Sequence, residues 1–284
     1  MFHKLRSFTS QRRFLSFVGL TFLLSWLCWI PAALSGQDVN SGNFLLFYVL
    51  GGFGPSISGI IMISFGEDKE TRHEFWKRVV DFRRISPNWF LFALLVFPTV
   101  FVTATSFGYL TGAPAPELPR LEQIVAAPLM LVSIVLAGIL TGPLSEELGW
   151  RGFALDQLQN RWSPLVASLI LAPVWWAWHL PLFFMRGTTQ YKWGVGSLDF
   201  WLFFAAILPL TLLLTWAYNQ NRHSVLLTVF MHFMYNFSLG MVYPLSQTAN
   251  IYHIGGMYVA AIAVLISTAR QGAHIGLREH SSTA

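Results

Sequence analysis

The sequence predicts an all-α protein: a polytopic bundle of about eight transmembrane helices. Of its 284 residues, 54% are hydrophobic and only 11% are charged, whereas a soluble globular domain carries roughly 25% charged residues. So few charges cannot cover a surface that faces water, but they suit one that faces lipid. The 12 Trp and 8 Tyr residues also fit a protein with two membrane–water interfaces, where their amphipathic rings prefer to lie.

Eight apolar segments are long enough to cross a bilayer, which takes about 20 residues of helix. We expect these spans at residues 14–35, 43–65, 89–111, 124–156, 163–186, 198–220, 224–243 and 251–269. The first follows a basic start, as a signal peptide does, but it exceeds the roughly 7–15 apolar residues of such a signal, so we expect it to remain uncleaved. The fourth contains Gly142-Pro143 and is expected to tilt, break or end in an interfacial turn there.

The distribution of Lys and Arg predicts the orientation. With the N-terminus in the cytoplasm, all 18 of them fall on the cytoplasmic side except Arg120, Arg186 and Lys192, as the positive-inside rule requires. We therefore expect a multi-pass protein of the cell membrane with both termini cytoplasmic. Residues 1–13 are the N-terminal segment, residues 14–270 the bundle, and residues 271–284 a short cytoplasmic tail without regular structure. The loop 66–88 mixes charges with aromatic residues and is expected to form an interfacial amphipathic helix.

The composition argues against a nucleic-acid partner and rules out sites that need several cysteines. The net charge of +5 comes without a basic stripe interleaved with aromatic residues in a polar domain, so no nucleic-acid partner is expected. The lone cysteine, Cys28, allows no intramolecular disulfide and no cysteine-based zinc site.

A few ionisable residues lie inside predicted spans, where a charged side chain costs about 2.5–3.5 kcal/mol on insertion scales. Of the 13 acidic residues, only the adjacent pair Glu146 and Glu147 lie well inside a span, and among the histidines only His179 and His232 do. His253, at the outer start of the last span, has an ordinary interfacial explanation.

The spacing of these residues indicates that they converge. Three pairs are four residues apart: Glu147 and Arg151, Trp175 and His179, and His232 and Asn236. Each pair lies on one helix face, and polar faces in a membrane turn toward the interior of the bundle. We therefore expect one cavity lined by three spans. Straight helices would put His179 about 24 Å along its span and His232 about 12 Å along its own. Convergence therefore requires tilt, breaks near Pro143, Pro173 and Pro181, or span boundaries that differ from those expected.

The two glutamates are expected to differ in role. Glu147 can form an ion pair with Arg151 in the favourable order along a helix. Glu146 points about 100° away and is left without an obvious cation, so its carboxylate could accept a proton from water. His179 and His232 could orient that water, donate to an oxyanion or bind a metal, and Asn236 offers an amide donor of the oxyanion-hole type.

Each of these residues also has a structural explanation. A Glu–Arg pair can serve packing or topology, a buried His can simply be hydrogen-bonded, and an intramembrane Asn often links helices. Proton-coupled transporters use Glu and His too, although the internal repeats common in transporters are missing here. The residues alone therefore predict a polar intramembrane cavity with acid–base groups.

Three motifs resemble those of a known family. The run from Glu146 to Arg151 is similar to a Glu-Glu-x-x-x-Arg motif, the run from Trp175 to His179 to an aromatic residue followed by His, and the run from His232 to Asn236 to His-x-x-x-Asn. In this order they resemble the CPBP family of intramembrane proteases, also called the CAAX protease and bacteriocin-processing or Abi family. The expected protease core spans about residues 124–245.

The resemblance implies an intramembrane CAAX-type endopeptidase that cleaves a lipidated or membrane-associated protein or peptide. By motif, Glu146 would be the general base, His179 would position water, and His232 with Asn236 would stabilise the oxyanion. The supporting residues would be Glu147, Arg151 and Trp175. A divalent metal such as zinc, if used, would be bound by Glu146, His179 and His232, but we favour a metal-independent water. The alternatives are a non-catalytic immunity or scaffold protein of the same fold and an ion-coupled transporter.

Overall fold

The computed structural model describes the backbone of residues 2–281 and the side chains of residues 11–268, and every regular element in this part of the chain is helical. The all-α prediction is therefore confirmed. Within the described residues, seven helices are long and apolar enough to cross a membrane, and a pair of shorter helices bent by 44° forms an eighth candidate span.

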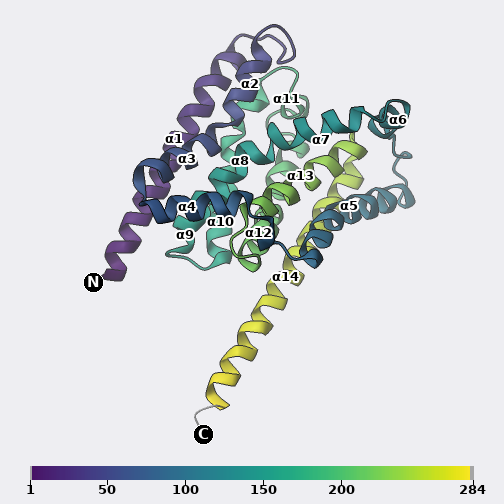
Figure 1. Cartoon of the computed structure of the whole chain (residues 1–284). Helices are drawn as coiled ribbons and strands as arrows, with labels where there is room; N and C mark the ends of the chain where they lie inside the picture. The colour runs from purple at the N-terminus through teal and green to yellow at the C-terminus, as the bar shows by residue number, and fades with distance from the viewer. Residues whose placement is uncertain (1, 282–284) are drawn as a thin grey trace.

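The helices are arranged as an irregular bundle (Figure 1). In chain order they are α1 (Phe2–Leu34), α2 (Phe44–Gly52), α3 (Gly54–Gly66), α4 (Lys69–Val80), α5 (Pro87–Leu110), α6 (Pro119–Ala126), α7 (Met130–Leu140), α8 (Pro143–Gly149), α9 (Leu155–Gln159), α10 (Pro164–Trp178), α11 (Thr189–Trp193), α12 (Leu198–Gln220), α13 (Val225–Val242) and α14 (Gln247–Ser281). Three short turns of other helix types complete the list: η1 (Phe82–Arg84), η2 (Trp150–Ala154) and η3 (Leu180–Phe184).

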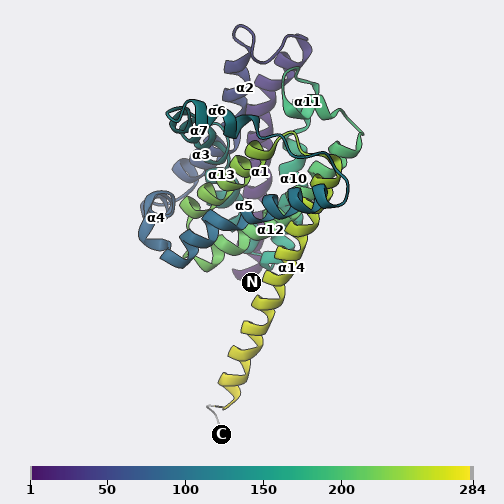
Figure 2. The same cartoon turned by 90° about the vertical axis from the view of Figure 1, so that its right-hand side faces the viewer.

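Each predicted span has a counterpart in the structure. The second is the bent pair α2 and α3, and the fourth is the 30-residue stretch Met130–Gln159. The prediction for the C-terminus was wrong in part, because α14 continues as helix to Ser281, beyond the expected end of the last span. Residues 282–284 of the expected tail lie outside the described residues. In both views α14 extends well beyond the rest of the bundle (Figures 1 and 2).

The fourth span is interrupted where Gly142-Pro143 predicted it. Gly142 has φ −131° and ψ −96°, outside the helical region, and Pro143 starts α8, a position where its missing N–H costs nothing. A second irregularity follows: α8 passes into the π-helical turn η2 before α9. Such turns are rare and occur frequently at functional sites.

Contacts between the start of α1 and two charged loops bring these segments together at one end of the bundle. Arg13 forms an ion pair with Glu67 at 2.5 Å, and Arg161 donates to Gln11 at 2.5 Å. At the other end, the amide of Val39 donates to the carbonyl of Arg186 at 2.8 Å. The start of α1 and the end of α14 lie on the same side of the bundle (Figure 1), which agrees with an even number of spans.

The predicted amphipathic helix in the loop 66–88 is present as α4, and it is docked through Arg78. This side chain is only 7% exposed. Its Nη1 donates to Asp156 Oδ2 at 2.5 Å and to the hydroxyl oxygen of Tyr218 at 2.5 Å, and its Nη2 donates to the carbonyl of Gly152 at 3.2 Å. Tyr218 in turn donates to Asp156 at 2.8 Å. Arg78 therefore ties α4 to η2, α9 and α12.

We predict that Arg78→Met destabilises the fold by about 1.5–3 kcal/mol, because it removes charge-assisted hydrogen bonds of a buried guanidinium to Asp156 and Tyr218. The matched control is Arg83→Met, since Arg83 pairs with Asp81 at 3.0 Å while 79% exposed, and an exposed pair contributes about 0–1 kcal/mol. Unfolding of both variants in detergent, followed by circular dichroism, measures the difference. Equal unfolding midpoints would contradict the anchoring role.

Candidate active site

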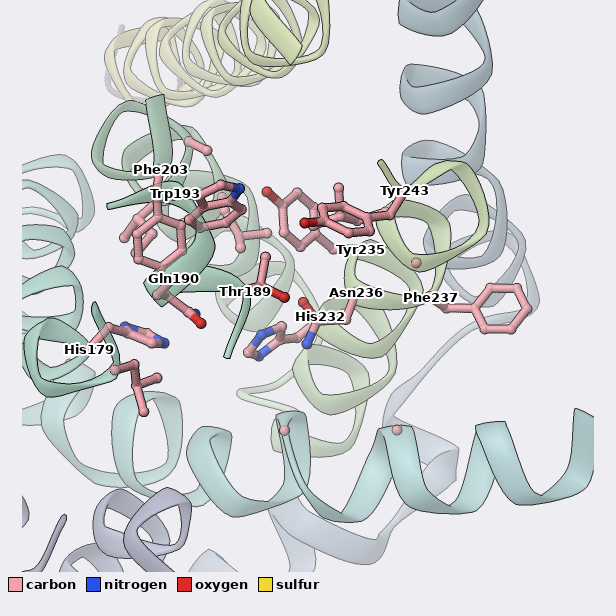
Figure 3. A pocket seen from close by; sticks show the side chains of 18 of the residues that line it. His179, Thr189, Gln190, Trp193, Phe203, His232, Tyr235, Asn236, Phe237 and Tyr243 are labelled. Atoms are coloured by element: carbon pink, nitrogen blue, oxygen red, sulfur yellow. The ribbon is translucent and has the colours of Figure 1, made fainter. Parts of the chain in front are cut away.

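A cavity of about 880 Å³ lies among α7, α8, α10, α12 and α13, with further walls from α2, α6, α11 and α14. It is lined by all four residues that the sequence predicted to converge: Glu146, His179, His232 and Asn236. Figure 3 shows His179 and His232 reaching into it from different helices, with Asn236 beside His232.

Helix ends help to bring these residues to the wall of one cavity. His179 directly follows α10 as its C-cap residue, and Pro181 lies in the η3 turn that comes next. Of the three breaks considered, those near Pro143 and Pro181 are present, whereas Pro173 lies inside α10 without ending it.

Glu146 is held in a defined position but keeps one oxygen free. The residue is 8% exposed, and its Oε2 accepts a hydrogen bond from the indole Nε1 of Trp175 at 2.7 Å. Among the described residues, none donates a hydrogen bond to its other oxygen, Oε1. The carboxyl group can therefore exchange a proton with a small molecule in the cavity while Trp175 fixes its orientation.

Glu147 does more than pair with Arg151. Its Oε1 accepts from Arg151 Nη1 at 2.7 Å and also from His232 Nδ1 at 2.9 Å, and Glu147 and Arg151 are both fully buried. The guanidinium carbon of Arg151 lies 4.5 Å from the ring centroid of Trp175, a favourable cation–π distance. The predicted ion pair thus also orients a histidine of the cavity.

The hydrogen-bond partners of the two histidines define how the rings face the cavity. His179 Nδ1 lies 2.8 Å from the carbonyl oxygen of Trp175, and His232 Nδ1 lies beside the Glu147 carboxylate. Both partners are acceptors, so Nδ1 is assigned the hydrogen in each ring. Each Nε2 is left for the cavity, where a neutral ring offers a lone pair and a protonated ring offers an N–H donor.

Aromatic side chains hold both imidazole rings edge-on. The ring of Trp175 meets His232 with centroids 5.3 Å apart and planes at 83°. Trp178 and Phe203 contact His179 at 4.7 Å and 5.2 Å, also nearly perpendicular. These T-shaped contacts are the favoured geometry for aromatic pairs, and they limit rotation of the rings.

Several lining residues were not identified from the sequence. Tyr48 of α2 lines the cavity, as do Thr189 and Gln190 of α11. His253, for which we expected an ordinary interfacial role, is 1% exposed, lines the cavity and stacks on Phe101 with centroids 4.2 Å apart. Asn250 and His253, three residues apart at the start of α14, were the signal that could have revealed this polar face.

The cavity does not group side chains for a metal ion. Among the residues that the structure describes, no three His, Cys, Asp or Glu side chains are placed to hold one. Glu146, His179 and His232 line the same cavity, but they are not grouped so that one ion could bind to all three.

Comparison with known proteins finds a matching family model and a similar curated protein. Residues 128–238 match the family model described as type II CAAX prenyl endopeptidase Rce1-like. The chain is also 27% identical over 248 residues to the CAAX prenyl protease 2 of Methanococcus maripaludis, an alignment that covers 87% of this chain and 90% of that protein. The matched region contains all of the residues that the sequence predicted for the site.

We predict that Arg151→Met destabilises the bundle by about 3–5 kcal/mol, because it leaves the Glu147 carboxylate buried without its arginine. The double variant Glu147→Gln/Arg151→Met should recover most of this loss, since both charges are then removed together. Thermal unfolding of the purified variants in detergent checks both expectations. A double variant no more stable than Arg151→Met would show that the loss does not come from an unpaired charge.

Proposed function

Because residues 128–238 belong to the Rce1-like family of type II CAAX prenyl endopeptidases, we propose that this chain is an intramembrane endopeptidase that uses a glutamate-activated water. Its substrate is a lipidated or membrane-associated protein or peptide, cleaved close to its C-terminus. The observation that carries the proposal is the Glu146 carboxyl, which is oriented by Trp175 and keeps one oxygen for the cavity that it shares with two histidines.

Glu146 acts as the general base. Its Oε1 accepts a proton from a water molecule while the water oxygen attacks the carbonyl carbon of the scissile peptide bond. The same carboxyl then gives that proton to the amine nitrogen as the C–N bond breaks. The Nε2 lone pair of His179 accepts a hydrogen bond from the other O–H of the water. This contact directs the water oxygen toward the substrate.

His232 and Asn236 stabilise the charge that develops on the carbonyl oxygen. The amide of Asn236 supplies one donor, and His232 supplies Nε2–H when its ring is protonated. Its Nδ1–H donates to the Glu147 carboxylate, which keeps the ring oriented toward the reacting group. Fixed donors in a site shielded from bulk water are effective because they need no reorganisation during the reaction.

The apolar wall of the cavity suits a substrate with a membrane-associated end. On α12 this wall includes Leu202, Phe203, Ala206 and Leu210. We also place both termini in the cytoplasm, because the loops with most of the Lys and Arg residues meet at the end of the bundle where α1 begins and α14 ends.

We predict that Glu146→Gln lowers turnover by about 10²–10⁴-fold, the usual contribution of a general base. Gln keeps an oxygen that accepts from Trp175, so the variant should unfold at the temperature of the wild type. Cleavage of a fluorogenic lipidated peptide library by purified protein in detergent measures the loss, with the exposed Glu117→Gln as the matched control. Full activity in Glu146→Gln would exclude the mechanism. Inactivity of the wild type would favour a scaffold or immunity protein.

A second prediction concerns metal dependence. We expect a strong chelator to leave the cleavage rate unchanged, because Glu146 can activate water by itself and no three His, Cys, Asp or Glu side chains of the described residues are grouped to hold a metal ion. The measurement is turnover of the purified protein before and after prolonged dialysis against the chelator. Loss of activity that added zinc restores would contradict a metal-independent mechanism.

A further inference from the structure

The cavity has a second polar end, away from the two histidines, where Arg120 of α6 reaches its wall. A Cβ atom placed on Gly240 of α13 would lie 3.2 Å from Arg120 Nη1. The guanidinium group therefore occupies the space that a side chain at position 240 would fill. The absence of a side chain on Gly240 lets Arg120 lie directly on α13.

This guanidinium lies on the same face of α13 as the proposed oxyanion donors. His232, Asn236 and Gly240 follow one another at intervals of four residues, and all three line the cavity. A rise of 1.5 Å per residue separates His232 from Gly240 by about 12 Å along the helix axis. An extended peptide covers at most about 3.3–3.6 Å per residue, so three residues span about the same distance.

The charge of Arg120 is available to a ligand. Within the part of the chain that the structure describes, Arg120 makes no hydrogen bond or ion pair. Lys192, the other Lys or Arg residue that lines the cavity, lies in the field of an acid: hydrogen bonds from Asn40 lower the pKa of Asp38, and the charges of Arg186 and Lys192 lower it further. Arg120 also lies against Gly240, on the α13 face that carries His232 and Asn236, and is therefore the better candidate for binding an anion.

We propose that Arg120 binds the free C-terminal carboxylate of the substrate, three residues beyond the scissile bond. This inference rests on the proposed function. A C-terminal Cys-a-a-X sequence carries its lipid on the cysteine, and cleavage after that cysteine releases a tripeptide with a free carboxylate. The planar fork of an arginine matches a carboxylate in a bidentate arrangement. Arg120 thus selects substrates by the length of chain between the scissile bond and the C-terminus.

The test compares three S-farnesylated peptides that share one sequence: one ending in a free carboxylate after Cys-Val-Ile-Ala, its C-terminal amide, and a version extended by two residues. Purified wild type in detergent should cleave the first with kcat/KM at least about tenfold above the other two, as expected for a lost charge-assisted hydrogen bond. In Arg120→Gln the ratio between acid and amide should fall toward one. Arg120→Lys should keep part of it.

Lys192→Gln is the matched control, because it removes the other cation of the cavity wall and should keep the wild-type ratio. Equal cleavage of acid and amide by the wild type overturns the inference and leaves the proposed function standing, as does an unchanged ratio in Arg120→Gln. An equal loss of the ratio in Lys192→Gln overturns the assignment to Arg120. Failure of the wild type to cleave any of the three peptides overturns the proposed function, and the inference with it.

Discussion

One oxygen atom of Glu147 accepts hydrogen bonds from both Arg151 and His232, and the remaining geometry of the site depends on this double contact. Two adjacent carboxyl groups inside a membrane bundle cannot both remain charged without a partner. Arg151 neutralises Glu147, which leaves Glu146 to face the cavity. Because the same oxygen also orients His232, the ion pair links α8 and η2 to α13.

Trp175 extends this network to the third helix of the site. Its indole N–H donates to Glu146, its ring lies under Arg151 and against His232, and its carbonyl accepts from His179. A bulky indole has few accessible rotamers once it is packed, so these contacts together define where each acid–base group points. Trp175 thus contacts Glu146 and Arg151 of the first motif and His179 of its own motif.

Interruptions in two of the membrane helices help to bring the three motifs together. Pro143 starts a new helix within the fourth span, and α10 ends at Trp178 just before Pro181. Each interruption places backbone and side-chain groups that cannot face lipid at the wall of one cavity. On the far side of η2 from this cavity, Arg78 fixes the position of α4 against Gly152, Asp156 and Tyr218.

The sequence by itself determined the helical class, the eight spans and the set Glu146, His179, His232 and Asn236, because a residue that is costly in lipid must face inward and hydrophobic length reveals a span. It also predicted the pairing of Glu147 with Arg151, which is local within one helix. Only the tertiary structure decided that Glu147 also holds His232, that Trp175 donates to Glu146, and that His253 and Arg120 line the cavity. These contacts join residues from different helices, and side-chain periodicity specifies a helix face but not the neighbour that packs against it.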